Sequence, residues 1–272
     1  IEKGKLKTHL ISKTGTIVPT YLREFYIPDE TIKSSVITIA DFTRRYLIST
    51  YNIPEEKVEL LYQGTDLDRF QPNLNAQGEA IKRYPLPVNA SPILGIIGSI
   101  EPRKGHLMLF SALKKLVFSD LPNIHLIIAG DGPDETFLKQ ETKNMGLEKH
   151  ISFFPFTNEP NYIFERIDLT VLSSLYKEGL PNVLLESMAM KVPVVSSNLG
   201  GVPELVIDGE TGLMVEPGNP DALASAIKEI WSNQEMYQKM KINSRNLIEN
   251  KFNKTIQFDR YKKHLIQLAT QT

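Results

Sequence analysis

Short apolar runs alternate with amphipathic stretches along most of the chain from residue 93 onward. This alternation is typical of βαβ units, in which crossover helices join parallel strands, so it predicts an α/β fold built on a parallel sheet. The expected strands cover residues 93–98, 124–129, 151–154, 169–173, 192–196 and 213–215. Six such strands are enough for a doubly wound domain.

Helices are expected between and after these strands. They cover residues 106–118, 134–145, 181–190, 221–231, 235–250 and 254–268. Asn219 before Pro220 is a suitable helix cap, and Gly146 is a suitable stop for the helix that begins near residue 134. At helical spacing, Phe110, Phe118 and Trp231 are interpreted as core side chains.

A second, smaller α/β segment precedes the main pattern. Strands at residues 36–39 and 58–62 flank a helix at 41–51, which makes one more βαβ unit. Residues 72–92 are rich in Pro, Asn and Gly, so this segment is expected to be a linker.

Charge and cysteine content narrow the functional class. Lys and Arg number 31 and Asp and Glu number 32, so no bulk positive field favours nucleic acid. The absence of cysteine excludes disulfides, thiolate zinc sites and a cysteine nucleophile, and it fits a reducing compartment, with the cytoplasm as the default. No apolar run approaches the ~18 residues needed to span a bilayer, so neither a transmembrane segment nor a signal peptide is expected, while peripheral contact with the inner face of a membrane stays open.

The most informative stretch is EGLPNVLLE at residues 178–186. Gly179 and Pro181 keep Glu178 in a loop and start a helix, which leaves the N–H groups of Asn182 and Val183 free as an anion site. Glu186 then lies about 7.5 Å along the helix from Pro181, at ~1.5 Å per residue.

The two glutamates of this stretch can therefore hold different parts of one extended ligand. A nucleotide-sugar has that shape, with a central diphosphate between sugar and ribose hydroxyls that carboxylates can bind. Taken alone, the plainer interpretation of the pair is a loop glutamate and a solvated or capping helix glutamate.

A basic turn follows the first strong strand. The sequence GSIEPRKG at residues 98–105 places Arg103 and Lys104 at the carboxyl edge of the expected sheet, where open α/β sheets bind ligands. Cations at this edge would face a diphosphate, although a basic pair in such a turn is by itself more often solvated. The turn is neither a P-loop nor a Gly-x-Gly-x-x-Gly fingerprint.

Taken together, four segments resemble glycosyltransferase family 4. They are GSIEPRKG, AGDGP at 129–133, EGLPNVLLESMAMKVPVVSSNLGGVPELV at 178–206 and GETGLMVEPGN at 209–219, and YQGTDLDRFQP at 62–72 is similar to the family's interdomain strand and turn. The resemblance implies a GT-B fold, in which two Rossmann-like domains face each other across a cleft. It also implies transfer that retains the anomeric configuration and requires no metal or other cofactor.

The resemblance divides the chain into four parts. Residues 1–71 would be a partial N-terminal, acceptor-side domain, 72–92 a linker, and 93–251 a complete nucleotide-sugar donor-binding domain. Residues 252–272 would form a helix that packs back on the N-terminal part.

The resemblance also implies roles for individual residues. Glu178 would hold hydroxyls of the donor sugar, Glu186 would hold the ribose, and Lys104 with Arg103 would neutralise the leaving diphosphate. The remaining donor-binding candidates are Gly98, Ser99, Phe156, Thr157, Gly179, Leu180, Pro181, Asn182 and Val183. Ser99 departs from the family, because many members carry an arginine there. His9 stands roughly where the family places a histidine near the donor sugar.

Other polar residues have plainer interpretations. Asp66 and Asp68 are expected to form a turn and not a metal-binding Asp-x-Asp motif, and Asp131 is likewise expected in a turn. Histidines 106, 125 and 150 are expected to be structural or solvated.

The predicted function is a glycosyltransferase that moves a hexosyl group from a nucleotide diphosphate-sugar to an acceptor hydroxyl on a carbohydrate or lipid-linked molecule. Two alternatives stay open: a nucleotide-sugar-binding subunit or fragment without transferase activity, and a nucleotide-sugar epimerase.

Overall fold

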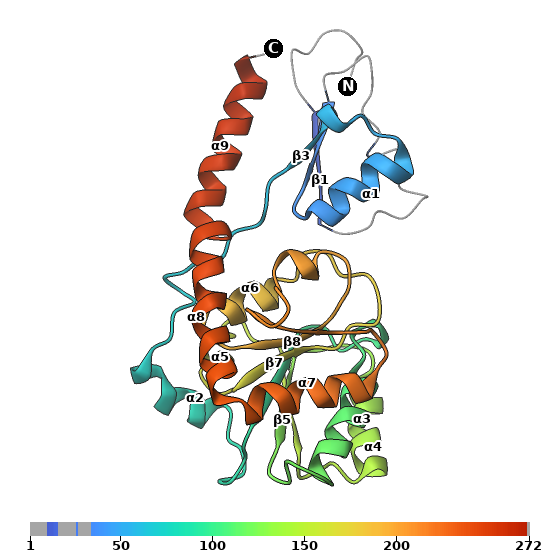
Figure 1. The fold of residues 1–272 in the computed structure, drawn as a ribbon, viewed down its shortest axis with the longest axis vertical. Helices are drawn as coiled ribbons and strands as arrows, with labels where there is room; N and C mark the ends of the chain where they lie inside the picture. The colour runs from blue at the N-terminus through green and yellow to red at the C-terminus, as the bar shows by residue number, and fades with distance from the viewer. Residues whose placement is uncertain (1–9, 16–25, 27–33, 271–272) are drawn as a thin grey trace.

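The computed structural model describes residues 10–15, 26 and 34–270, and its larger part is built on a six-stranded parallel sheet. The strand order is β6-β5-β4-β7-β8-β9 (Figure 1). The strands are β4 (Ile93–Ile97), β5 (His125–Ala129), β6 (Ile151–Phe154), β7 (Leu169–Leu172), β8 (Val194–Ser197) and β9 (Gly212–Val215). This parallel architecture confirms the α/β class expected from the sequence.

Helices cover both faces of this sheet (Figure 1). They are α3 (His106–Val117), α4 (Glu135–Met145), α5 (Asn161–Phe164), α6 (Asn182–Ala189) and α7 (Pro220–Ser232). Strand β5 shows how the sheet joins two cores: Leu126 and Ile128 pack in the cluster with α3, α4 and α7, whereas Ile127 and Ala129 pack with α5 and α6. Burial on both faces is why these strands are nearly continuous apolar runs. This body is called the large unit below.

A small unit precedes the large one. It contains β1 (Leu10–Thr14), β2 (Ser34–Thr38), α1 (Asp41–Tyr51) and β3 (Val58–Leu60), with the parallel strand order β1-β2-β3. Its core is Val36, Leu47, Tyr51, Ile53 and Val58. Strand β1 was not predicted, because LISKT has no apolar run long enough to stand out.

The expected linker at residues 72–92 contains structure of its own. A short turn at Leu74–Ala76 leads into helix α2 (Gln77–Arg83), and Ala80 and Tyr84 are buried. The Tyr84 ring meets the Phe154 ring edge-on at 5.0 Å, so this segment is attached to the large unit.

Two long helices end the chain, α8 (Gln234–Lys251) and α9 (Lys254–Thr270). Helix α8 lies along the large unit, and α9 continues upward beside the small unit (Figure 1). The Tyr261 hydroxyl donates to Leu61 O at 3.1 Å, and Lys13 Nζ lies 5.3 Å from the Tyr261 ring.

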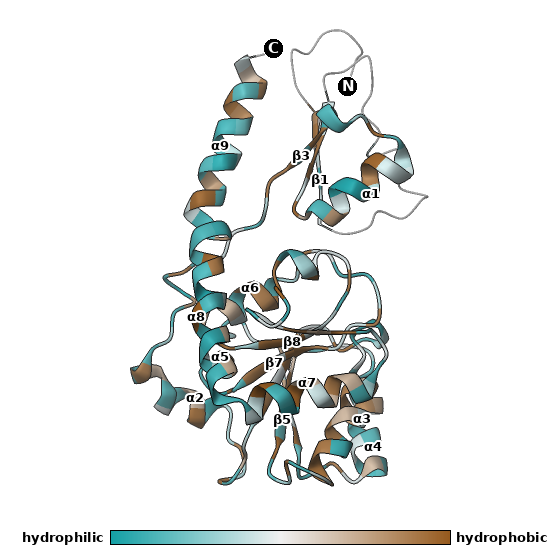
Figure 2. Ribbon diagram, viewed as in Figure 1, coloured by the Kyte–Doolittle hydropathy of each residue, from teal (hydrophilic) through white to brown (hydrophobic). Residues whose placement is uncertain are grey.

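Hydropathy follows these layers (Figure 2), with apolar residues concentrated in the strands of the large unit. The core prediction is right for Phe110, which is fully buried, and wrong for Phe118, which is 70% exposed because α3 ends at Val117 and Phe118 caps it. Among the described residues, no helix has the length and apolarity needed to cross a membrane.

Candidate functional site

A cleft of about 860 Å³ opens at the carboxyl ends of the central strands, where Ile97 and Ala129 line its floor. Ile39 of the small unit lines the cleft, and so does Gln63, which lies in the segment that follows β3. The predicted site residues that line it are Gly98, Ser99, Arg103, Lys104, Phe156, Thr157, Glu178, Leu180, Pro181, Asn182, Val183 and Glu186. Gly179 is not among the lining residues, and His9 lies outside the described residues.

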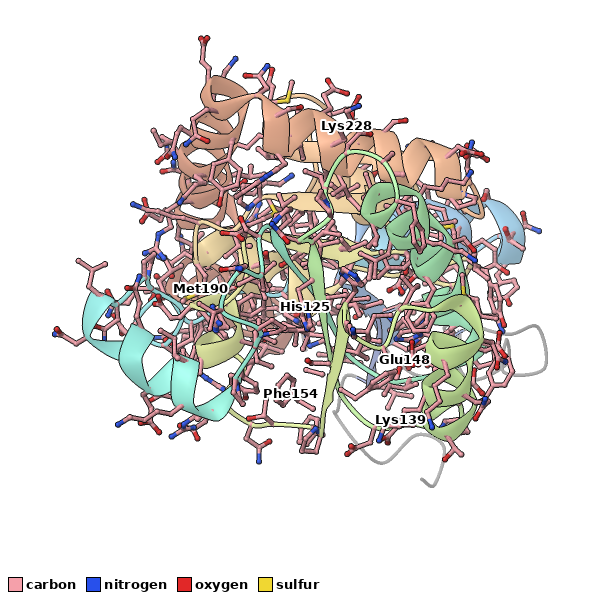
Figure 3. All side chains as sticks on the ribbon, turned by 90° about the horizontal axis from the view of Figure 1, so that it is seen from below. His125, Lys139, Glu148, Phe154, Met190 and Lys228 are labelled. Carbon is pink, nitrogen blue, oxygen red and sulfur yellow. The ribbon has the colours of Figure 1, made fainter. Side chains whose placement is uncertain are left out.

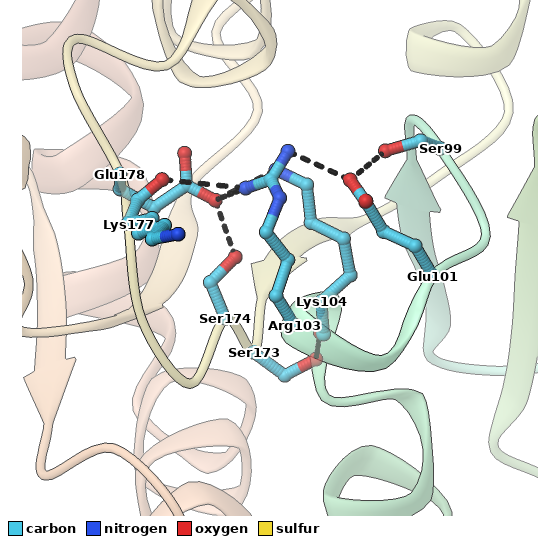
Figure 4. Close-up of polar contacts among 8 residues, drawn as sticks. All are labelled: Ser99, Glu101, Arg103, Lys104, Ser173, Ser174, Lys177 and Glu178. Atoms are coloured by element: carbon cyan, nitrogen blue, oxygen red, sulfur yellow. Dashed lines mark hydrogen bonds and ion pairs between the residues drawn. The ribbon is translucent and has the colours of Figure 1, made fainter. Parts of the chain in front are cut away.

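Glu178 is the centre of a charged cluster in the cleft (Figure 4). Its Oε1 atom accepts hydrogen bonds from Lys104 Nζ at 2.6 Å, Arg103 Nη1 at 3.1 Å and Ser174 Oγ at 2.6 Å. The Glu178 side chain is only 7% exposed, and Lys104 is 14% exposed. The two cations therefore compensate a carboxylate that would otherwise be costly to bury.

A second carboxylate orients Arg103 from the other side. Glu101 Oε1 contacts Arg103 Nη2 at 2.8 Å and accepts from Ser99 Oγ at 2.6 Å (Figure 4). The hydrogen bond from the Ser99 hydroxyl lowers the pKa of the Glu101 carboxyl most, and the neighbouring Arg103 guanidinium lowers it further. Ser99 thus contributes a hydrogen bond that fixes the basic turn.

The backbone holds this basic turn against the end of β7. Ser173 Oγ donates to Lys104 O at 2.9 Å, and Leu175 N donates to Arg103 O at 2.7 Å. Gly105 has a left-handed φ of 66°, and a Cβ there would meet Ser173 O at 2.1 Å. Only glycine fits this close approach, which explains the glycine at the end of GSIEPRKG.

The loop that carries Glu178 is supported from behind by residues 200 and 201. Gly201 N donates to Gly179 O at 3.0 Å, and a Cβ on Gly200, whose φ is 55°, would lie 1.9 Å from Glu178 O. Lys177, just before Glu178, also has a left-handed φ of 57°. A non-glycine residue in this region stores backbone strain, which is typical of functional loops.

Helix α6 begins directly after this loop. Pro181 is its N-cap, so the helix starts at Asn182, one position after the start expected at Pro181, and the first intrahelical bond runs from Leu184 N to Pro181 O at 3.1 Å. The N–H groups of Asn182 and Val183 precede that bond, so they remain at a helix amino terminus that favours anions.

Glu186 lies further along α6 and faces the same cleft. Burial raises the pKa of its carboxyl to about 7, against the opposing attraction of the Arg69 guanidinium. Among the described residues no hydrogen bond or ion pair to this carboxylate is found, so its hydrogen-bonding capacity is left for a ligand.

Sequence reasoning missed the residues that reach the cleft from outside the large unit. Gln63 donates to Asn182 Oδ1, and Arg69 donates to the carbonyl of Asn158. Arg69 follows a local turn, in which Asp66 Oδ1 accepts from the N–H groups of Asp68 and Arg69 at 3.2 Å each. That bonding makes the Asp-rich turn expected from the sequence, and the turn holds Arg69 at the cleft.

The remaining polar candidates have structural partners. Asp131 Oδ1 accepts from Phe156 N at 3.1 Å, so it shapes the loop at the cleft edge. His125 lies in the interior of the large unit while Lys228 lies on its surface (Figure 3), and His125 Nε2 contacts Ser152 Oγ at 2.9 Å. In the part of the chain that the structure describes, no group of three or more His, Asp or Glu side chains is placed to hold a metal ion.

The sequence of the chain matches a known protein family. The sequence model of the family described as glycosyl transferases group 1 matches residues 79–247. The GDP-mannose-dependent alpha-(1-6)-phosphatidylinositol monomannoside mannosyltransferase of Mycolicibacterium smegmatis is 32% identical over 206 residues, 72% of this chain and 53% of that protein. The chain spans about half the length of the curated relatives it matches.

Solved structures show the same fold. The glycosyltransferase of Rickettsia africae aligns with a TM-score of 0.86 at 22% identity, over 96% of this chain and 71% of that one. Anabaena HepE, solved in complex with UDP and glucose, aligns with a TM-score of 0.85 at 21% identity, over 94% of this chain and 71% of that one.

Proposed function

The chain belongs to the glycosyl transferases group 1 family, and from this premise we propose that its cleft binds a nucleoside diphosphate-sugar for transfer to an acceptor hydroxyl. The observation that carries the proposal is the convergence of two cations, a helix amino terminus and two acids on one cleft of about 860 Å³. That volume lies within the usual range of small-molecule sites, roughly 300–1,000 Å³.

We assign the parts of the donor by their chemistry. The diphosphate lies between the N–H groups of Asn182 and Val183 and the cations Lys104 and Arg103. Glu178 accepts hydrogen bonds from the hydroxyls of the donor sugar. Glu186 accepts hydrogen bonds from the ribose hydroxyls. Phe156 and Thr157, which also line the cleft, flank the base.

The cations act when the glycosidic bond to the diphosphate breaks. A lysine ammonium has three N–H donors, so Lys104 can keep its hydrogen bond to Glu178 and still donate another to a phosphate oxygen. Negative charge grows on the leaving diphosphate in the transition state, and cations placed beforehand stabilise it without reorganisation. In this proposal Lys104 and Arg103 take the role that a metal ion has in other transferases, and the anomeric configuration is retained.

The acceptor is proposed to be a carbohydrate or a lipid-linked hydroxyl. The relative from M. smegmatis is named for a phosphatidylinositol monomannoside acceptor, which makes a membrane-surface acceptor worth testing. Peripheral contact at the inner membrane face is part of this proposal.

Calorimetric titration with UDP-, GDP- and ADP-sugars tests donor binding. We expect one of them to bind, unchanged by EDTA, and Glu186→Ala to weaken binding roughly 10-fold or more because hydrogen bonds to a charged acceptor contribute ~1.5–3 kcal/mol. Absence of binding by all three, or full affinity in Glu186→Ala, would refute the site. Sugar-nucleotide turnover without an acceptor would favour an epimerase instead.

A further inference from the structure

A carboxylate of the large unit binds the first turn of a helix in the small unit. Glu204 lies in a turn of 3-10 helix at Val202–Glu204. Its Oε2 accepts from Asp41 N at 2.8 Å, and its Oε1 accepts from Phe42 N at 2.9 Å. Both distances are typical of charge-assisted hydrogen bonds, and the partners are 163 and 162 residues apart in sequence.

Helix α1 has no cap of its own at this end. Its N-cap is Ala40, which has the extended conformation of a capping residue (φ −144°, ψ 141°) but no side chain that can accept a hydrogen bond. The positive end of the helix and its free N–H groups are therefore satisfied from the other unit. Burial and the nearby Glu204 carboxylate raise the pKa of Tyr62, so the Tyr62 side chain also lies beside this contact.

The Glu204 contact is continuous with the donor cleft. The turn before it, at Gly200 and Gly201, supports the backbone of Glu178 and Gly179. On the other side, Ile39 of the small unit lines the cleft and precedes Ala40 and α1. Glu204 thus joins the wall that carries Glu178 to the wall that carries Ile39.

We propose that Glu204 is a positioning residue that clamps the small unit against the large unit and so holds the cleft in the arrangement seen in the structure. The inference rests on the proposed function only in that the cleft is taken to bind a nucleotide-sugar. Glu204 itself is not one of the residues that line the cleft. A merely local role, in which Glu204 only stabilises α1, makes a different experimental prediction.

The distance between the units can be measured directly, because the chain contains no cysteine. Exposed positions Ser49 on α1 and Ser225 on α7 accept dyes after Ser49→Cys and Ser225→Cys substitution. In the absence of ligand, Glu204→Ala should lower and broaden the single-molecule transfer efficiency, and Glu204→Gln, which keeps a carbonyl acceptor, should lie between the two. Glu210→Ala removes an exposed carboxylate six residues further on and should leave the distribution unchanged.

A second substitution separates clamping from capping. Ala40→Ser supplies a hydroxyl acceptor at the N-cap of α1 itself, so combined with Glu204→Ala it should restore the helical content and the melting temperature of the chain while the units stay separated. Unchanged transfer efficiency in Glu204→Ala would overturn the proposal. So would recovery of the wild-type distribution in the Ala40→Ser double variant.

Donor titration keeps this inference separate from the proposed function. If the wild type binds a nucleotide-sugar, Glu204→Ala should bind it 3- to 10-fold more weakly, and equal affinity would contradict the clamp. If the wild type binds none, the proposed function fails, while the dye measurement still decides the clamp by itself.

Discussion

Glu186 is buried, and the described part of the chain offers its carboxylate no hydrogen bond or ion pair, which has a measurable consequence for stability. Its pKa rises from 4.5 to about 7 in the folded protein. Between these values the native state keeps a proton that the unfolded chain has released, so stability is lost as pH rises through this window. The shift corresponds to at most about 3 kcal/mol, and contact with water reduces it to roughly 1–2 kcal/mol.

Glu186→Gln should therefore be more stable than the wild type by roughly 1–2 kcal/mol at pH 8, with the difference shrinking as pH falls toward 4.5. Urea unfolding at a series of pH values measures this. Glu210→Gln, at an exposed position, is the matched control and should follow the wild type. A gain that is independent of pH would mean that the Glu186 carboxyl titrates normally.

Strand β5 begins with a buried histidine. His125 is 3% exposed, and burial, followed by repulsion from His150, lowers its pKa to about 4. Below pH 6.5 the unfolded chain takes up a proton that the native strand does not. Stability is therefore present above pH 6.5 and is lost as pH falls toward 4.

His125→Gln removes this titration and keeps a side chain that can hydrogen-bond Ser152. The fall in unfolding free energy between pH 7 and pH 5 should be smaller in the variant by roughly 1–2 kcal/mol. Thermal or urea unfolding at the two pH values gives the comparison, and parallel curves would contradict it. Burial also lowers the pKa of His106 to about 4. A double variant that replaces both histidines with Gln should therefore show a still smaller change in unfolding free energy between the two pH values.

At the scale of the whole molecule, local patterns predicted the large unit well. Its strands are predominantly apolar and mostly buried, and the parallel arrangement brings residues 98–104 and 178–186 to one edge. Contacts between segments that are far apart in the sequence could not be predicted from these local patterns. Arg69 and Glu204 acquire their positions only when the two units are placed together, and LISKT becomes a strand only because β2 pairs with it.

We expect the small unit to depend on α9 more than the large unit does, because its own core is a handful of side chains on three short strands and one helix. Tyr261→Ala removes the hydrogen bond to Leu61 O and the contact with Lys13. We expect faster amide hydrogen exchange in β2 and α1 and unchanged exchange in β5, as measured by mass spectrometry of peptides from the intact chain. Phe258→Ala, on the same helix but 67% exposed, is the control and should change neither. Equal acceleration in both units would mean that they unfold as one cooperative body, with α9 stabilising the whole chain and not the small unit in particular.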